Sequence, residues 1–168
     1  MTTSLISTTV PSPVGELTLV GSDAGLRAVL WPNERAGRVT FAEPLAAGSH
    51  PILDATATQL GHYFDRSLTC FDLPFDVAGT EFQVDVWRAL GQIPFGETRS
   101  YGELAADLGK PSAARAVGAA TGRNPLSIVI PCHRLVGQSG KLTGFAGGIE
   151  AKRWLLDHES TNQSLSLL

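Results

Sequence analysis

Cys132 lies in the run Ile130-Pro131-Cys132-His133-Arg134, where a thiol is followed directly by an imidazole and a guanidinium. A cysteine attacks as the thiolate, and cationic or hydrogen-bonding neighbours favour that form. Adjacent residues of an extended chain point to opposite faces, so His133 reaches the thiol only through a bridging water or a bend after Pro131. We interpret Cys132 as a reactive nucleophile and His133 as its base.

A histidine that acts as a base needs an acceptor to orient its ring, usually a carboxylate. Glu159 and Asp157, at the end of a helix predicted over residues 149–159, are both candidates by position. The other cysteine, Cys70, is expected to be an inert buried thiol, because free cysteines are among the most buried residues.

The segments on either side of Cys132 must position the thiol. Residues 126–131 are β-branched and apolar and follow the turn signal Asn124-Pro125, which predicts a buried strand that ends at the cysteine. Residues 137–148 are rich in glycine, which is typical either of a flexible hairpin and loop or of a loop that exposes backbone polar groups to a planar ligand. Phe145 would form a wall of that pocket.

Residues 101–109 and 113–121 predict two short helices joined by a tight turn that contains glycine, as in a helix-turn-helix. Ser112 is the expected cap of the second helix, and Thr80 the cap of an earlier helix that continues to Ile93. The second helix carries one long polar side chain, Arg115, among small residues. Two interpretations stay open: close packing against a neighbouring helix, or a slim helix that approaches DNA.

The N-terminal half has a different pattern. Residues 5–31 alternate between apolar and polar and are interrupted by glycine, proline and aspartate, which predicts short strands joined by hairpins. Residues 32–50 predict an irregular loop, residues 51–64 a helix, and residues 69–77 a strand and connector into a second unit. The expected fold class is therefore α+β: a small antiparallel sheet with a helix, then a mostly helical domain that contains the helix-turn-helix.

Composition excludes several classes of protein. The 168 residues contain no apolar run long enough for a membrane span and no signal peptide. This predicts a cytoplasmic protein that does not associate with membranes. The chain lacks the cysteine and histidine spacing of a metal site, so no metal is expected. Residues 98–153 hold eight basic and three acidic side chains, against five and eleven in residues 1–97. This asymmetry indicates contact with a polyanion through one half of the chain.

The motifs around the cysteine resemble those of the O6-alkylguanine-DNA alkyltransferases, the methylated-DNA–protein-cysteine methyltransferases. The resemblance covers about residues 79–159 and includes Pro131-Cys132-His133-Arg134, Asn124-Pro125, Ala114-Arg115-Ala116-Val117-Gly118, Phe82-Gln83, Val86-Trp87, Ile93-Pro94-Phe95-Gly96-Glu97-Thr98, Ser100-Tyr101 and Gly147-Gly148-Ile149. It implies a ribonuclease H-like domain over residues 1–78 and a DNA-binding and alkyl-acceptor domain over residues 79–160, followed by a tail over residues 161–168. Residues 160–168 are expected to be disordered.

The resemblance implies single-turnover DNA repair without a cofactor. Cys132 would take the alkyl group from O6-alkylguanine flipped out of double-stranded DNA bound by its minor groove, with O4-alkylthymine as a second candidate substrate. His133 would take the thiol proton through water and Glu159 would orient the imidazole. Tyr101 would donate toward the base, and Asn124 would brace the turn. The implied substrate and DNA contacts are Arg115, Ala114, Gly118, Ser100, Arg123, Leu135, Phe145 and Ala146.

Two positions depart from the family pattern. Phe145 replaces a common tyrosine, and Ala146 stands where some members carry serine, so only its backbone contact carries over. A monomer is expected, with cooperative assembly on DNA as a further possibility. The alternatives are a binding-only protein of the alkyltransferase-like type, a helix-turn-helix transcription factor, and a cysteine hydrolase that turns over repeatedly.

Overall fold

The computed structural model describes residues 4–166, and the side chains of residues 4–160. The chain divides into two compact units. The first comprises residues 4–79 together with Pro125–Val129, and the second comprises Thr80–Asn124 together with residues 130–166. No helix within the described part of the chain is long and apolar enough to cross a membrane.

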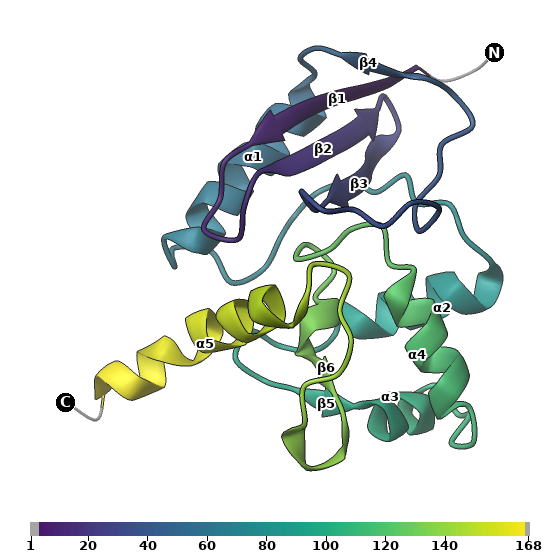
Figure 1. Cartoon of the computed structure of the whole chain (residues 1–168), viewed down its shortest axis with the longest axis vertical. Coiled ribbons are helices and arrows are strands. Elements are labelled where there is room, and N and C mark those ends of the chain that lie inside the picture. Colours follow the sequence, from purple (N-terminus) through teal and green to yellow (C-terminus); the bar gives the residue numbers. More distant parts are fainter. Residues whose placement is uncertain (1–3, 167–168) are drawn as a thin grey trace. The chain divides into compact units, whose positions relative to one another are not determined.

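The first unit is built on a four-stranded sheet (Figure 1). Its strands are β1 (Leu5–Val10), β2 (Leu17–Ser22), β3 (Gly25–Leu30) and β4 (Leu45–Ala47), in the order β3-β2-β1-β4. The first three pair antiparallel, as their hairpin signals predict, whereas β4 runs parallel to β1. Strand β4 lies in a stretch expected to be loop, and its three exposed residues give no apolar pattern.

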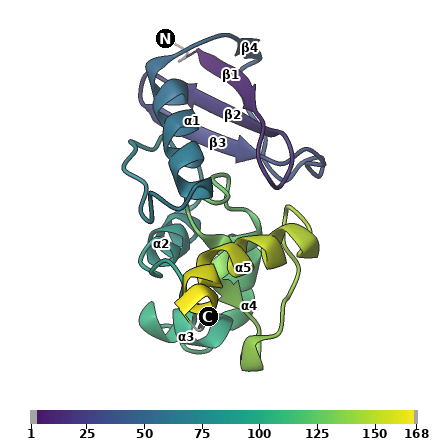
Figure 2. The same cartoon turned by 90° about the vertical axis from the view of Figure 1, so that its left-hand side faces the viewer.

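Helix α1 (Pro51–Phe64) covers one face of this sheet (Figure 2). His50 caps the helix by accepting a hydrogen bond from the backbone N–H of Ile52, and Pro51 suits the first turn. The helix lies close to β2, because a Cβ built on Gly21 would come within 2.7 Å of Cγ2 of Ile52. Only glycine leaves room for this approach.

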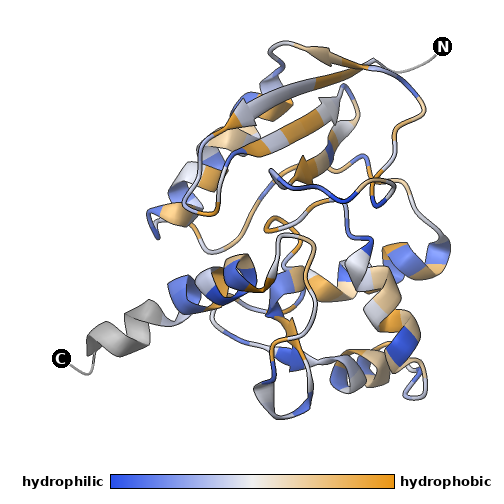
Figure 3. Ribbon diagram, in the orientation of Figure 1, coloured by the Kyte–Doolittle hydropathy of each residue, from blue (hydrophilic) through white to orange (hydrophobic). Residues whose placement is uncertain are grey.

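Both faces of the sheet in the first unit carry buried side chains. Leu17, Leu19 and Val29 lie on one face, whereas Val20 and Ala28 lie on the other and pack with Leu5, Leu30, Val39 and Phe41. The strands carry hydrophobic segments in Figure 3, and α1 carries both hydrophobic and hydrophilic ones. Helix α1 covers one face, where Gly21 meets Ile52, and Val39 and Phe41 cover part of the other face.

The strand expected over residues 69–77 is wrong. The segment forms a single bridge, between Phe75 and Leu26, and is otherwise irregular. The backbone N–H of Leu26 donates to the carbonyl of Pro74 at 2.8 Å, and the carbonyl of Leu26 accepts from the N–H of Asp76 at 2.8 Å. Cys70 is exposed, which corrects the expectation of a buried thiol. Loss of strand pairing leaves this stretch at the surface.

The second unit is mainly helical. Its elements are α2 (Glu81–Leu90), β5 (Arg99–Ser100), α3 (Tyr101–Asp107), α4 (Ala114–Gly122), β6 (Leu135–Val136), α5 (Ile149–Ser166) and two short 3-10 turns, Cys132–Arg134 and Gln138–Gly140. Strands β5 and β6 pair in parallel. The α+β fold class predicted from the sequence is confirmed.

Helix α2 begins at Thr80, whose hydroxyl accepts from the N–H of Gln83 while the Gln83 side chain accepts from the N–H of Thr80. This reciprocal capping box satisfies two backbone donors. Helix α4 begins differently: its cap is Ala113, without a side-chain hydrogen bond, so the expected cap at Ser112 is wrong. The Nε1 of Trp87 donates to the carbonyl of Ala120 at 2.8 Å and joins α2 to α4.

Helix α5 is longer than predicted. The sequence indicated an end at Glu159 and a disordered tail over residues 161–168, whereas the helix continues to Ser166. Residues 167–168 of that tail lie outside the described residues.

The segment Pro125–Val129 belongs to the first unit. The backbone N–H of Val29 donates to the carbonyl of Pro125 at 2.8 Å, and Nε1 of Trp31 donates to Oγ of Ser127 at 3.0 Å. The prediction of a strand over residues 126–131 is wrong, because the chain turns at Ile128, whose φ is +73°. A β-branched residue rarely adopts this conformation. The hydrogen bonds to Val29 and Trp31 both hold the residues that precede this turn, Pro125 and Ser127.

Candidate active site

Cys132 opens a 3-10 turn that ends at Arg134, and its side chain is buried with 4% of its surface exposed. The turn is set by two hydrogen bonds to the carbonyl of Ile130, from the N–H of Cys132 at 2.7 Å and from Nδ2 of Asn124 at 2.9 Å. With three residues per turn, consecutive side chains project about 120° apart. The bend after Pro131 therefore keeps Cys132 and His133 from pointing to opposite faces.

His133 and Arg134 both contact Glu159 of α5. The Nε2 of His133 lies 2.7 Å from Oε2 of Glu159, and Arg134 makes two hydrogen bonds to the same carboxylate, at 2.8 and 3.0 Å. A further Arg134 nitrogen donates to the carbonyl of Ile93 at 2.6 Å. The carboxylate that orients the imidazole is thus Glu159, one of the two candidates from the sequence.

The charges of this cluster are strongly coupled. Burial raises the pKa of Glu159, but hydrogen bonds from His133 and Arg134 and their positive charge outweigh burial and hold the pKa far below its usual range. Burial lowers the pKa of His133, and its contact with Glu159 only partly offsets this. Glu159 is therefore ionised and His133 neutral near pH 7.

These protonation states fix the tautomer of the imidazole. An ionised carboxylate only accepts, so Nε2 of His133 carries the hydrogen and donates it to Glu159. The other nitrogen, Nδ1, is then the basic one. It is buried and has no hydrogen-bond partner among the described residues. The arrangement leaves a basic lone pair on the residue next to the cysteine.

A second set of polar groups lies around Tyr101. The phenol oxygen of Tyr101 is 2.5 Å from Oγ1 of Thr143, and Nζ of Lys152 lies 3.4 Å from the same hydroxyl. Nζ also donates to the carbonyl of Leu135 at 2.7 Å and lies 6.0 Å from the ring centre of Phe145. Tyr101, Leu135 and Phe145 were expected around one ligand pocket, and Lys152 connects them.

The exposed face of α4 consists mainly of small residues. Helix α4 packs against α2 and α3 through its buried residues Val117, Ala120 and Thr121. Arg115 is exposed on the other side, with Ala116 and Ala119. The small residues are thus not all accounted for by helix packing, which favours the second of the two interpretations of this helix.

Several expected contacts occupy the region of α3 and α4. A Cβ built on Gly118 would lie 3.5 Å from the ring of Tyr101, so the helix passes close to that ring. Ser100 caps α3, with its hydroxyl accepting from the N–H of Glu103. Arg123 follows the end of α4 and is exposed. Ala114 opens α4, and Ala146 lies in the loop before α5; both are partly buried.

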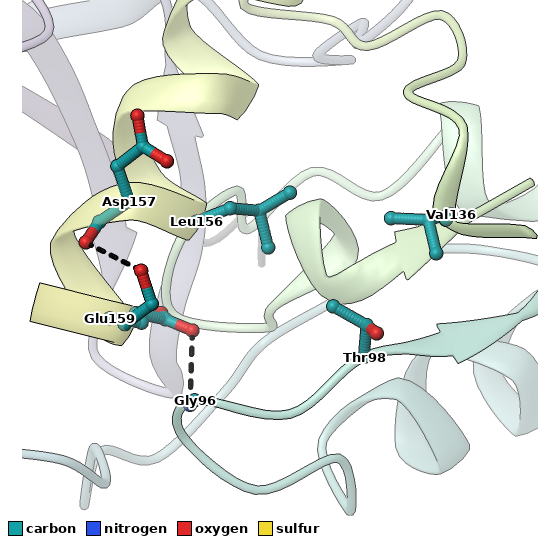
Figure 4. A pocket seen from close by; sticks show the side chains of 8 residues that line it. Gly96, Thr98, Val136, Leu156, Asp157 and Glu159 are labelled. Carbon is teal, nitrogen blue, oxygen red and sulfur yellow. Dashed lines mark hydrogen bonds between the residues drawn. The ribbon is translucent and has the colours of Figure 1, made fainter. Parts of the chain in front are cut away.

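A pocket of about 230 Å³ lies beside Glu159 in the second unit (Figure 4). Its lining residues are Gly96, Thr98, Val136, Gly140, Leu156, Asp157, Glu159 and Ser160. The N–H of Gly96 donates to Glu159 at 3.4 Å at the edge of this pocket. Its volume admits several water molecules, each of about 30 Å³ in the liquid. Solvent can therefore come close to the buried carboxylate.

The sequence did not single out Lys152 or Thr143. Lys152 is 1% exposed although it lies on a mostly polar helix, where a lysine is normally solvated. No group of three or more metal-ligating side chains occurs within the part of the chain that the structure describes. The site is thus built from a thiol, an imidazole, a carboxylate and two buried cations.

The second unit thus holds a buried thiol that is followed in the chain by a neutral imidazole, together with the two short helices α3 and α4. Two family models match the chain: the 6-O-methylguanine DNA methyltransferase DNA-binding domain over residues 81–161, and the ribonuclease-like domain over residues 5–77. The chain therefore belongs to the 6-O-methylguanine DNA methyltransferase family, and the resemblance seen in the sequence is confirmed.

Relatives match over almost the whole chain. A methylated-DNA–protein-cysteine methyltransferase of Mycolicibacterium paratuberculosis is 51% identical over 95% of this chain and 94% of that protein. One from Methanosarcina acetivorans is 43% identical over 89% of this chain and 95% of its own length. The crystal structure of Mycobacterium tuberculosis OGT in complex with DNA has a TM-score of 0.85 and 45% identity, and covers 93% of each chain.

Proposed function

We propose that this protein repairs DNA directly, by moving the alkyl group of O6-alkylguanine in double-stranded DNA onto Cys132. The observation that carries the proposal is the buried Cys132-His133 pair, with the imidazole held by Glu159 at 2.7 Å. Relatives at 51% and 43% identity are named for transfer of a methyl group from DNA to a protein cysteine. The protein acts as both catalyst and acceptor.

The proton of the thiol leaves first. Nδ1 of His133 is the basic nitrogen, because Nε2 donates to Glu159. A water molecule between Nδ1 and the sulfur would relay the proton to the imidazole. The ionised Glu159 stabilises the imidazolium that forms, and Arg134 keeps that carboxylate ionised. The thiolate of Cys132 then attacks the alkyl carbon.

Tyr101 acts on the other end of the reaction. A guanine that leaves as the anion is a poor leaving group, and a hydrogen bond from the phenol makes its departure easier. Backbone groups of Leu135 and Ala146 would contact the edges of the base, and Phe145 would cover its face. Asn124 braces the turn through its hydrogen bond to Ile130.

DNA binding is assigned to the helix-turn-helix. The small exposed residues of α4 permit a close approach to the minor groove, and Arg115 would fill the space left by the flipped base. Ala114, Gly118, Ser100 and Arg123 would contact the DNA around it. The excess of basic residues over residues 98–153 favours binding to the phosphate backbone.

The reaction ends after one cycle. The product is a thioether, which has no good leaving group, and no second base lies in place to hydrolyse it within the described site. The protein is proposed to act as a monomer without a cofactor in the cytoplasm.

The test is the intact mass of the protein after incubation with a duplex that contains O6-methylguanine. We expect a gain of one methylene group per molecule, mapped to Cys132 and lost in Cys132→Ser. Cys70→Ser is the matched control and should keep the gain, because Cys70 is exposed and outside the site. An unchanged mass would support a binding-only protein, and repeated turnover would support a cysteine hydrolase; either result would overturn the proposal.

A further inference from the structure

We propose that Trp87 is a positioning residue for the repair of duplex DNA: its indole fixes helix α4, and with it Arg115, relative to the turn that holds Cys132. This inference rests on the proposed function and adds a residue to it. It arises from three buried hydrogen bonds of the second unit, which join α2, α4 and the acceptor turn Cys132–Arg134 into a closed ring. Trp87 is 3% exposed, so it acts through α4 and not on the DNA itself.

The first link of the ring joins α2 to α4. The Nε1 of Trp87 donates to the carbonyl of Ala120 at 2.8 Å. Ala120 lies in the last turn of α4, where backbone carbonyls have no partner N–H within the helix. The same carbonyl accepts from the N–H of Arg123 at 3.1 Å, so it would keep one donor without the indole. The indole thus holds the end of α4 from which the chain continues toward the acceptor turn.

The other two links join the acceptor turn to both helices. Asn124 lies just after α4, and its Nδ2 donates to the carbonyl of Ile130 at 2.9 Å. The N–H of Cys132 donates to the same carbonyl at 2.7 Å. Arg134, at the other end of the turn, donates at 2.6 Å to the carbonyl of Ile93, just after the end of α2. These bonds attach the turn to α4 and α2, and the indole closes the ring between the two helices.

Packing alone fixes the orientation of α4 only weakly. Its N-cap, Ala113, makes no side-chain hydrogen bond, and its buried side chains are the small Val117, Ala120 and Thr121. Apolar packing is non-directional, whereas a hydrogen bond restricts both distance and angle. A small rotation of α4 about its axis changes its apolar burial little. The bond from the indole therefore decides the orientation of the helix.

The orientation of α4 decides where Arg115 points. At 3.6 residues per turn, Arg115 and Ala120 lie about 140° apart around the helix. Arg115 is exposed and Ala120 is buried, in agreement with this angle. A rotation of α4 therefore swings Arg115 across the exposed side. Repair of a duplex needs Arg115 in the DNA stack while Cys132 faces the alkyl carbon, and a misplacement of about 1 Å can cost about a hundredfold in rate.

A free base makes a smaller demand on the protein. It needs the thiol of Cys132, the imidazole of His133 and the phenol of Tyr101. The imidazole is held by Glu159 at 2.7 Å and the phenol by Thr143 at 2.5 Å, and neither contact includes α4 or the indole. A change confined to the orientation of α4 should therefore slow repair of the duplex and spare the reaction with the free base.

The first test compares two rates of Cys132 methylation, with an O6-methylguanine duplex and with free O6-methylguanine, both followed by intact mass. We expect Trp87→Phe, which keeps an aromatic ring and removes the N–H, to slow the duplex reaction about tenfold and to change the free-base reaction less than about twofold. Thr80→Ala is the matched control and should change neither rate, because it weakens the capping box of the same helix and leaves the indole in place. Parallel losses on both substrates, an unchanged duplex rate, or the same loss in Thr80→Ala would overturn the proposal.

A second variant keeps the shape of the indole. Replacing Trp87 with benzothienylalanine exchanges the N–H for sulfur and fills the same space. This variant should show the same selective loss on the duplex, and it decides the matter where Trp87→Phe fails to fold. Retention of the wild-type duplex rate would contradict the role of the hydrogen bond.

The link from Trp87 to Arg115 is tested by a double-mutant cycle. In an Arg115→Ala background, Trp87→Phe should slow the duplex reaction less than about twofold, because the side chain that α4 positions is already absent. Losses of about tenfold in both backgrounds would contradict an action through Arg115.

Failure of the proposed function has a different signature. Wild-type protein that gains no methyl group from either substrate defeats that proposal, whereas an active wild type with an unaffected Trp87→Phe defeats only the role of Trp87. The affinity for the same duplex, measured by fluorescence anisotropy, reports on the indole in either case. It should fall in Trp87→Phe and stay unchanged in Thr80→Ala, and equal affinities in the two variants would count against the positioning of α4 by Trp87.

Discussion

Replacing Glu159 with glutamine tests how much the negative charge of this carboxylate stabilises the site. Glutamine has nearly the same shape, so packing in α5 is retained, but the negative charge that faces His133 and Arg134 is lost. Arg134 is 6% exposed and would keep only the carbonyl of Ile93 as a strong acceptor. The amide nitrogen of glutamine would also face groups that donate. The substitution therefore leaves a buried guanidinium uncompensated.

The expected loss in the free energy of unfolding is large. Removing one partner of a buried ion pair costs about 3–5 kcal/mol, because the other charge stays buried. Typical free energies of unfolding are about 5–15 kcal/mol, so a substantial part of the stability is lost. At about 2–4 °C per kcal/mol for a chain of this size, the melting temperature should fall by roughly 6–20 °C.

The loss of stability in Glu159→Gln should also depend on pH. The folded state holds the pKa of Glu159 far below the ordinary value of 4.5. A group whose pKa is lowered by folding contributes its full stability above its unfolded pKa, and this contribution is lost as the pH falls toward the folded pKa. The gap between wild type and Glu159→Gln should be constant between about pH 7 and pH 5 and should narrow below 4.5.

Urea unfolding followed by circular dichroism at several pH values measures this gap. Glu150→Gln is the matched control, since it makes the same chemical change at an exposed carboxylate of the same helix and should change stability by less than about 1 kcal/mol. A gap below about 1 kcal/mol near pH 7 would refute the account of the ion pair. So would a gap that stays constant down to about pH 3.

Three further predictions concern other parts of the chain. Arg115→Ala should slow repair of duplex DNA more than reaction with free O6-benzylguanine, measured as rates of Cys132 alkylation; equal losses would contradict a role in base flipping. Ser127→Ala should destabilise the protein by about 1–2 kcal/mol in urea unfolding, because it leaves the buried Nε1 of Trp31 without its acceptor. Thr80→Ala removes the capping box of α2 and should cost about 1 kcal/mol in the same assay, whereas Thr80→Ser should cost little.

Local patterns predicted much of the fold. The apolar spacing over residues 51–64 gives a helix with the observed bounds of α1, and the glycine and proline signals give the hairpins of β1 to β3. Thr80 was recognised as a cap because its hydroxyl and Gln83 act within one turn. Signals of this kind depend on neighbouring residues alone.

The failures involve contacts between distant residues. Residues 126–131 have high strand propensity, but Val29 and Trp31 hold this segment and Ile128 takes a left-handed conformation. Strand propensity depends on such context. Lys152 escaped notice for a related reason, because its contacts with Leu135 and Thr143 lie outside its own helix. The sequence left two carboxylates, Glu159 and Asp157, as candidate hydrogen-bond acceptors for His133. The fold places Glu159 against the imidazole.

The membership of Pro125–Val129 in the first unit has a consequence for dissecting this protein. The chain passes from the first unit to the second near Gly79, but it returns to the first unit at Pro125–Val129, shortly before Cys132. A fragment that starts at Thr80 would keep every side chain of the proposed chemistry, yet Pro125 and Ser127 would lose their partners. Cleavage after Gly79 should therefore leave two pieces that associate rather than an autonomous acceptor domain. Designs that transplant the reactive cysteine need to carry residues 29–31 with it.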